Sequence, residues 1–200
     1  SVSYTSTKFS EDFYETNTGI LDIVNHSYEG DVKFRNVNHF KISKSQSIEF
    51  GLEAKYLKAE YDNFYAAKTN ALGDSITAFA YQKNIVERKM ALFANYIVRP
   101  TKKFTSTIGI RSDHFTATGY KIAPRFSLSY NLSHRTSLYG SFGIFYQSLP
   151  LLFLTQNHNG EDLQTQKAQH YIFGLSHLLT EDTKITFEAY QKNYSNFPMD

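Results

Sequence analysis

Two hundred residues with a mass of 23.0 kDa fit one domain of ordinary size or a piece of something larger. The mean hydropathy of −0.43 excludes a bundle of transmembrane helices, because each such helix needs about 20 consecutive apolar residues. The 15 Tyr and 17 Phe exclude a disordered chain, since so many aromatic side chains bury where they can.

The near-balance of charge predicts no strongly electrostatic partner. Lys and Arg number 21 against 19 Asp and Glu, and basic residues form only short pairs such as Lys102-Lys103. We therefore expect no nucleic-acid partner. The chain has no cysteine, which excludes disulfides, thiolate zinc sites and cysteine nucleophiles. No signal peptide is apparent at Ser1.

Alternation of apolar and polar residues dominates the sequence and predicts an all-β protein. The alternation is blurred in the first two expected strands, where Lys33 and Arg35 interrupt it. It is clean from Ile48 to Tyr56 and again from Ile122 to Asn131. The expected strands, in chain order, are 1–9, 28–40, 47–61, 85–98, 104–115, 122–131, 137–147, 168–178 and 184–194.

Short and longer connections alternate strictly between these eight or nine strands. In an antiparallel up-and-down meander, this places every tight turn at one end and every longer loop at the other. The short ones are Lys41–Gln46, Arg99–Lys103, Leu132–Thr136 and Leu179–Thr183; the longer ones are Ser10–Ser27, Asp62–Asn84, Thr116–Lys121 and Ser148–Lys167.

Segregated loops favour a transmembrane β-barrel over a soluble sandwich, whose Greek-key connections mix loop lengths at both ends. In a barrel of the bacterial outer membrane, the apolar side chains contact lipid and the polar ones face the lumen. Aromatic side chains near strand ends then anchor the two interfaces, although each is also explained as an ordinary sheet-core residue. The expected interface aromatics are Tyr56, Tyr61, Tyr130 and Tyr146.

Several motifs resemble the barrel of TonB-dependent outer-membrane receptors. The run from Ala91 to Phe115, ALFANYIVRPTKKFTSTIGIRSDHF, is similar to a strand–turn–strand of that family ending in Gly109-Ile110-Arg111-Ser112-Asp113. Pro124-Arg125-Phe126 then opens a strand, as in the family. A later hairpin begins with a Tyr-x-x-Gly sequence at Tyr171. The resemblance is specific from Ala91 to Phe197 and rests on pattern alone before that.

The resemblance implies an N-terminal plug followed by a barrel of about 22 strands. We therefore expect residues 1–200 to be a barrel segment from the middle of a larger receptor, with the plug and the remaining strands outside this chain. Coupling to the TonB complex would pass through that plug. The implied activity is energised uptake of a scarce nutrient, such as a chelated metal, a cobalamin-like molecule, an oligosaccharide or a peptide.

No catalytic, metal or cofactor site is predicted. The seven histidines show no metal-binding spacing. The sequence around Ser141 lacks the G-x-S-x-G pattern of a nucleophile elbow. Glu49 and Glu53 lie on one strand face at about 13–14 Å, too far apart for an acid/base pair. We therefore expect neither an enzyme nor a resident cofactor.

The candidate ligand-binding residues lie in an outer loop and in the lumen. The loop Leu149–Gln166 starts with Leu151–Leu154 and then becomes polar. Its apolar start either helps to cover a binding cavity or simply folds back on the barrel rim. The candidates are His158, Asn159 and Glu161 in this loop, and Arg111 and Arg125 in the lumen.

Two other architectures stay open at this point. One is a small autonomous outer-membrane barrel of eight strands with a structural or adhesive role, its interior filled by paired charges. The other is a soluble all-β binding module in which the apolar faces pack on a second sheet. The residues that could form the paired charges inside the small barrel are Glu49, Glu53, Lys55, Arg111, Asp113 and Arg125.

Overall fold

The chain folds into long antiparallel strands, seen in a computed structural model that describes residues 1–16, 19–69, 75–151 and 164–197. No helix among these residues is long and apolar enough to cross a membrane. The strands are β1 (Val2–Tyr14), β2 (Leu21–Lys41), β3 (Gln46–Tyr65), β4 (Lys68–Thr69), β5 (Ser75–Ile76), β6 (Phe79–Thr101), β7 (Phe104–Phe115), β8 (Gly119–Asn131), β9 (Thr136–Gln147), β10 (Gln166–Leu178) and β11 (Lys184–Ser195).

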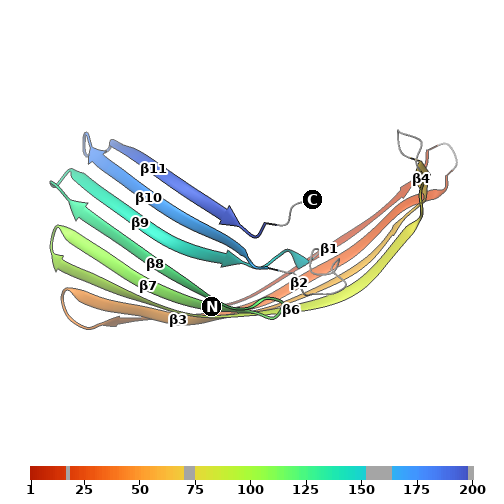
Figure 1. The fold of residues 1–200 in the computed structure, drawn as a ribbon, viewed down its shortest axis with the longest axis horizontal. Coiled ribbons are helices and arrows are strands. Elements are labelled where there is room, and N and C mark those ends of the chain that lie inside the picture. Colours follow the sequence, from red (N-terminus) through yellow and green to blue (C-terminus); the bar gives the residue numbers. More distant parts are fainter. Residues whose placement is uncertain (17–18, 70–74, 152–163, 198–200) are drawn as a thin grey trace. The chain divides into compact units, whose positions relative to one another are not determined.

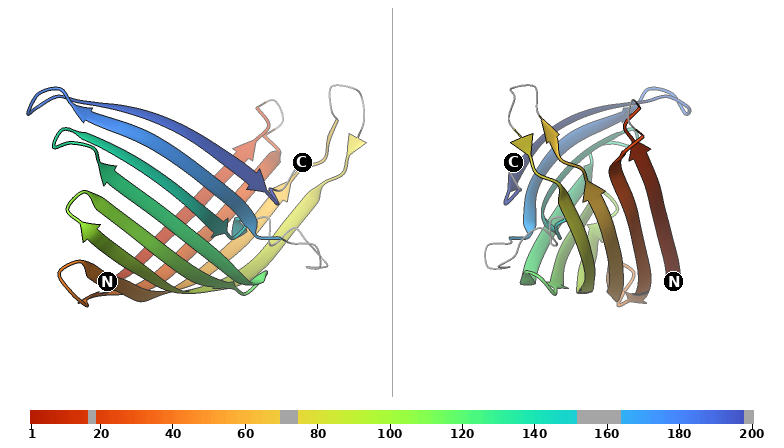
Figure 2. Two further views of the ribbon diagram at one scale, coloured as in Figure 1. Left: turned by 60° about the vertical axis from the view of Figure 1, so that its left-hand side comes forward. Right: turned by 90° about the vertical axis from the view of Figure 1, so that its right-hand side faces the viewer.

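The predicted meander is confirmed. Nine strands form one sheet in the order β1-β2-β3-β6-β7-β8-β9-β10-β11, so each strand pairs with its neighbour in sequence; β4 and β5 form a separate two-stranded sheet. All four predicted short turns join consecutive strands of the large sheet. These turns gather on one side in both Figure 1 and Figure 2. The predicted short turns therefore share one end of the meander. The connection Thr116–Lys121, predicted to be longer, is a tight turn, because β7 ends at Phe115 and β8 begins at Gly119.

The first two strands are longer than predicted. Residues 10–14 and 21–27, expected in a loop, continue β1 and β2, with Ser10 opposite His26 in the register. The alternation rule misses them because polar side chains on this hairpin satisfy each other across the strands. His26 Nε2, for example, lies 3.0 Å from Asp12 Oδ1. Similarly, β3 continues to Tyr65 and β6 begins at Phe79, which shortens the expected loop between them.

The chain divides into two compact units. The first comprises residues 1–34, 55–88 and 150–161, and the second comprises 35–54, 89–149 and 162–200. Strands β2, β3 and β6 each contribute to both units, because each has 20 to 23 residues. About 9–11 residues of a strand suffice to cross a membrane, so these strands are roughly twice that length.

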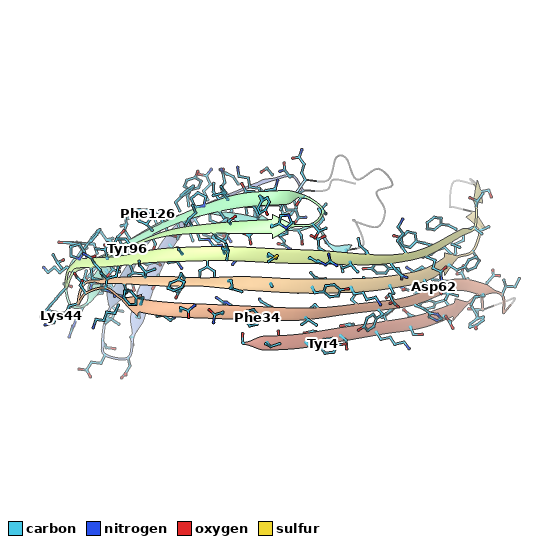
Figure 3. The ribbon with its side chains drawn as sticks, turned by 90° about the horizontal axis from the view of Figure 1, so that it is seen from below. Tyr4, Phe34, Lys44, Asp62, Tyr96 and Phe126 are labelled. Atoms are coloured by element: carbon cyan, nitrogen blue, oxygen red, sulfur yellow. The ribbon has the colours of Figure 1, made fainter. Side chains whose placement is uncertain are left out.

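The second unit has one apolar face that is exposed rather than buried. Phe126 pairs with Ile108 on one side and Phe142 on the other, so their side chains form a continuous row. Phe126 of this row is labelled in Figure 3. An exposed apolar band of this kind fits contact with lipid. Its exposed large members include Leu92, Ile108, Ile110, Ile122, Phe173 and Phe187.

Spin labels are expected to separate the two faces of β8 and β9 in the full-length protein. Labels at Phe126, Leu128 and Phe142 should report lipid, and labels at Ser127 and Ser141 should report water, because successive side chains of a strand point to opposite faces. Oxygen and nickel-chelate accessibility in lipid vesicles provides the measurement. Water at the first set, or burial of both sets, would contradict the membrane placement.

The first unit has a small apolar core on the face opposite Tyr56. Ala59, Tyr61 and Leu151 are its buried members, with exposures of 0, 6 and 8%. Leu57, Tyr81 and Ile85 pack against them. Leu151 therefore belongs to this core, whereas the choice between a cavity cover and a segment folded back on the barrel rim stays open for the apolar start of the loop. Residues 152–163 of that loop lie outside the described part of the chain.

Candidate functional site

Charged side chains gather on the polar face of the second unit, where Glu53 of β3 lies between two arginines. Glu53 Oε2 is 3.8 Å from Arg35 Nε, and Glu53 Oε1 is 3.6 Å from Arg111 Nη2. Arg111 Nε also donates a 2.8 Å hydrogen bond to Asp113 Oδ1. We call Arg35, Glu53, Arg111 and Asp113 the arginine–carboxylate cluster. Strands β2, β3 and β7 supply its members, so the cluster links distant parts of the sequence.

A second polar group lies beside this cluster. Asn95 Nδ2 of β6 donates a 2.9 Å hydrogen bond to Glu49 Oε1, whose other oxygen is 3.4 Å from His39 Nδ1. The hollow next to Glu49, Asn95 and Arg111 measures about 120 Å³. Binding pockets for small molecules usually measure about 300–1,000 Å³. The hollow therefore suits a single side chain from another segment better than a chelated nutrient.

Arg125 belongs to a row of residues that crosses the polar face. Asn95 pairs with Gly109, Gly109 with Arg125, Arg125 with Gly143, and Gly143 with His170. The Arg125 guanidinium carbon lies 4.5 Å from the centre of the Phe145 ring, a cation–π arrangement. Phe145 also contacts His170, with the ring centres 4.8 Å apart.

Aromatic rings cover three glycines of the polar face. The Phe93 ring lies over Gly51, Phe145 over Gly143 and Tyr139 over Gly174; a Cβ placed on any of these glycines would come within 3 Å of ring atoms. Tyr139 then donates a 2.8 Å hydrogen bond from its hydroxyl to Glu188 Oε2. Ring-over-glycine contacts lock neighbouring strands in register.

The structure brings together Arg111 and Arg125, the two lumen residues predicted to bind ligand, on the same polar face. Both line the 120 Å³ hollow. Their part in ligand binding stays a prediction. The other three candidates, His158, Asn159 and Glu161, lie outside the described residues.

The four aromatic residues expected at the membrane interfaces divide into two groups. Tyr56 and Tyr130 are 42 and 40% exposed, and Tyr146 lies on the same strand face as Phe142. Their interfacial role stays a prediction. Tyr61 differs, because it lies on the opposite face of β3 from Tyr56 and is only 6% exposed. Its odd position in the strand turns it away from the apolar side.

Tyr61 is a core residue of the first unit. Its hydroxyl donates a hydrogen bond to Glu29 Oε1 across the sheet. Burial raises the pKa of the Tyr61 hydroxyl, and the Glu29 carboxylate raises it further. Tyr61 lies beyond the roughly 9–11 residues after the β2–β3 turn that are needed to cross a membrane. The interfacial role predicted for Tyr61 stays a prediction, and its burial in this core does not support it.

The sequence missed three members of the polar face. Arg35 was read only as an interruption of the alternation, and neither Asn95 nor Phe145 was among the predicted site residues. A usable signal exists for Arg35, which has the same odd parity in β2 as Asp31 and His39. Asp31 forms an ion pair with Lys55 of β3 at 3.4 Å, so odd positions of β2 carry charges towards β3.

The charged side chains of the polar face mainly contact one another. Among the described residues, no three His, Asp or Glu side chains gather in a way that would hold a metal ion. The carboxylates of the arginine–carboxylate cluster accept hydrogen bonds and ion pairs from arginines. Such paired groups are suited to binding a polar surface rather than to transferring protons.

Comparison with known proteins decides the family. The family described as TonB dependent receptor-like, beta-barrel, matches residues 1–200. The chain belongs to this family. The resemblance read from the motifs between Ala91 and Phe197 is therefore confirmed, and it extends over the first 90 residues, where the sequence gave only a pattern. No curated protein sequence matches this TonB-dependent receptor segment significantly.

Solved structures with the same fold include two receptors and a copper transporter. A variant of the ferric enterobactin receptor from Pseudomonas aeruginosa matches with a TM-score of 0.69 at 17% identity, over 96% of this chain and 31% of that one. The copper transporter OprC matches with a TM-score of 0.74 at 12% identity, over 98% and 36%. The siderophore receptor PirA from Acinetobacter baumannii gives 0.68 at 12% identity, over 96% and 31%. The TonB-dependent receptor segment thus spans about a third of these chains.

Proposed function

We propose that the chain forms part of the barrel wall of a TonB-dependent receptor that imports a scarce nutrient across the bacterial outer membrane. The observation that carries this proposal is the opposite character of the two faces in the second unit. One face exposes apolar side chains, and the other holds the arginine–carboxylate cluster. Lipid contacts the first face, and the second lines the lumen.

The polar face supports a lumen filled by another polypeptide segment rather than an open channel. The hollow beside Arg111 and Arg125 measures about 120 Å³ and is lined by Glu49 and Asn95 as well. This size fits a side chain of a plug domain, which the family places inside its barrels. The residues of this chain then hold the plug, and transport energy reaches the receptor through the plug's contact with the TonB complex.

We propose chelated metal ions as the substrate class. The support comes from proteins of the same fold, which include a ferric enterobactin receptor, a siderophore receptor and a copper transporter. Cobalamin-like molecules, oligosaccharides and peptides are the alternatives. His158, Asn159 and Glu161, with oxygen and nitrogen donors in an outer loop, are the proposed first contacts for such a cargo.

A fractionation and uptake experiment tests this proposal. Antibodies against the 200-residue chain are expected to detect a polypeptide several times heavier than 23.0 kDa in the outer membrane of the source cells. Deletion of its gene should lower uptake of radioactive iron or copper chelates under metal limitation. Deletion of the energy-transducing TonB protein should lower it to the same level.

Each alternative architecture has its own outcome. A 23 kDa band in the outer membrane would mean a small autonomous barrel, and a soluble band would remove the membrane placement. The nine strands of the sheet already disfavour the first alternative, since single-chain bacterial barrels have an even strand number. A heavy outer-membrane band together with unchanged metal uptake in the deletion strain would support the receptor but contradict chelated metal ions as its substrate.

A further inference from the structure

The short-turn end of the second unit is strongly basic. Two acidic residues, Glu181 and Asp182, share these turns and the adjoining strand ends with seven basic residues. The other parts of the chain hold 14 Lys and Arg against 17 Asp and Glu, so positive charge is concentrated here. We call the seven the basic rim: Lys41, Lys44, Arg99, Lys102, Lys103, Arg135 and Lys184.

The charges of the basic rim are not neutralised by the protein. None of its seven side chains forms an ion pair with any described residue, and all seven residues are exposed. Elsewhere basic side chains have carboxylate partners: Lys55 pairs with Asp31 and Lys58 with Glu60. The rim is therefore open to an anion from outside the chain.

Backbone hydrogen bonds hold the turns of the rim side by side. The Arg99 amide donates to the Ser45 carbonyl at 2.7 Å, and the Asn131 amide donates to the Lys103 carbonyl at 2.8 Å. A third such bond joins Leu178 to Arg135, also at 2.8 Å. Each bond links one turn to the end of a strand beyond its own hairpin. The positive charges are thus presented in a fixed row, with Lys44 at one turn in Figure 3.

An exposed apolar belt borders the basic rim. Phe40 lies near the end of β2 and Ile42 in the first turn, and they are 62 and 47% exposed. Tyr130 lies near the end of β8 and Leu132 in the third turn, and they are 40 and 47% exposed. An aromatic and aliphatic belt followed by lysines and arginines matches the boundary between hydrocarbon and headgroups, where basic residues contact phosphate.

Hydroxyl groups lie among the basic side chains. A hollow of about 670 Å³ opens between the turns and is lined by Lys102, Lys103, Arg135 and Lys184. Ser133 and Thr136 of the third turn line the same hollow. Ser137 and Ser176, also in its walls, pair with each other on the polar face of the sheet, so the hollow itself opens on that face. At the turns, cations and hydroxyls together can contact the oxygens of a phosphate group.

We propose that the basic rim binds the headgroups of anionic phospholipids, such as phosphatidylglycerol, in the membrane leaflet at the short-turn end. The inference rests on the membrane placement given under the proposed function. In outer-membrane barrels the short turns face the periplasm, so the leaflet concerned is the phospholipid leaflet. The net charge of the whole chain does not indicate this site, because the excess of positive charge at the short-turn end is offset by acidic residues elsewhere.

The full-length receptor in phosphatidylethanolamine vesicles tests the proposal. Spin-labelled phosphatidylglycerol and spin-labelled phosphatidylethanolamine are compared by the fraction that the protein immobilises. The wild type should prefer phosphatidylglycerol, since each basic residue near a charged membrane surface changes lipid binding about fivefold. The variant K102Q/K103Q/R135Q/K184Q should lose most of this preference. Removing three cations from the first unit in K8Q/K58Q/K83Q is the matched control and should leave it unchanged.

The outcomes separate this inference from the proposed function. Equal immobilisation of both lipids by the wild type, or an undiminished preference in the rim variant, would overturn the lipid site while the protein stays in the membrane. Failure of the receptor to enter vesicles would instead contradict the membrane placement. The faster gel mobility of the unheated barrel shows that each variant is folded. High salt should weaken the preference, because it screens the exposed charges.

Discussion

Gly51→Ala is expected to destabilise the folded barrel wall strongly, whereas Gly140→Ala is tolerated. A Cβ on Gly51 would lie 2.2 Å from the Asn36 carbonyl oxygen and 2.8 Å from the Phe93 ring. The ring can move, but the carbonyl belongs to the neighbouring strand and cannot. On Gly140, the nearest atom to a Cβ is the Ile172 carbonyl oxygen at 3.6 Å, an ordinary contact.

The expected difference between these two variants is large. Overpacking against backbone costs about 3 kcal/mol, while alanine in place of a compatible glycine stabilises by about 0.5 kcal/mol through the unfolded chain. The measurement is the temperature at which the full-length receptor in detergent loses the fast gel mobility of its folded form. Equal temperatures for the Gly51 and Gly140 variants would contradict the close packing of β2 against β3.

A second substitution shows whether the Phe93 ring or the Asn36 carbonyl causes the loss of stability in Gly51→Ala. Phe93→Leu in the Gly51→Ala background removes the ring contact but keeps the carbonyl contact. We therefore expect only partial recovery of the melting temperature. Full recovery would mean that the ring alone excludes a side chain at position 51. No recovery, together with a normal Phe93→Leu single variant, would assign the whole effect to the Asn36 carbonyl.

The second unit was predictable because apolar and polar side chains alternate strictly along its strands, as lipid contact on one face would require. Every second side chain must be apolar where the sheet contacts hydrocarbon, so the alternation from Ile122 to Asn131 defines β8 to within a few residues. The turns are short and polar, which fixes their positions too. Lys41 to Gln46, for example, separates β2 from β3 as expected.

The first unit was less predictable because water contacts much of both its faces. Ser10, Asp12 and His26 carry no alternating pattern, yet they lie in paired strands. Their hydrogen bonds are between the strands and cannot be read from one segment alone. The arginine–carboxylate cluster was missed in part for the same reason. Its four members come from three strands, and Arg35 stands 76 residues before Arg111 in the sequence.

Arg111→Met is expected to destabilise the folded receptor more than any other single change in the arginine–carboxylate cluster. Arg111 contacts Asp113 at 2.8 Å and Glu53 at 3.6 Å, and the side chains of these two carboxylates are only 10 and 22% exposed. Removing the arginine leaves both negative charges without this partner. Breaking a buried pair costs about 3–5 kcal/mol, and partial exposure reduces this to about 3 kcal/mol.

Charge alone does not preserve the cluster, so Arg111→Lys is expected to fall between the wild type and Arg111→Met. The guanidinium uses Nε for Asp113 and Nη2 for Glu53, which a single ammonium cannot match in geometry. A loss of about 1–2 kcal/mol is expected. A melting temperature for Arg111→Lys equal to that of the wild type would show that only the net charge matters.

A double-mutant cycle identifies the partner of Arg111. Combining Arg111→Met with Asp113→Asn should cost less than the sum of the two single losses, because the second change removes the carboxylate that the first leaves unpaired. We expect a coupling of at least about 1 kcal/mol. Glu188→Gln is the control: Glu188 binds Tyr139 on a different part of the polar face, so its effect should simply add. Additive losses in both cycles would show that the hydrogen bond between Arg111 and Asp113 does not stabilise the folded receptor. Coupling confined to Asp113 would place the strength of the cluster in β7 itself, with Glu53 serving to attach β3 and β2 to it.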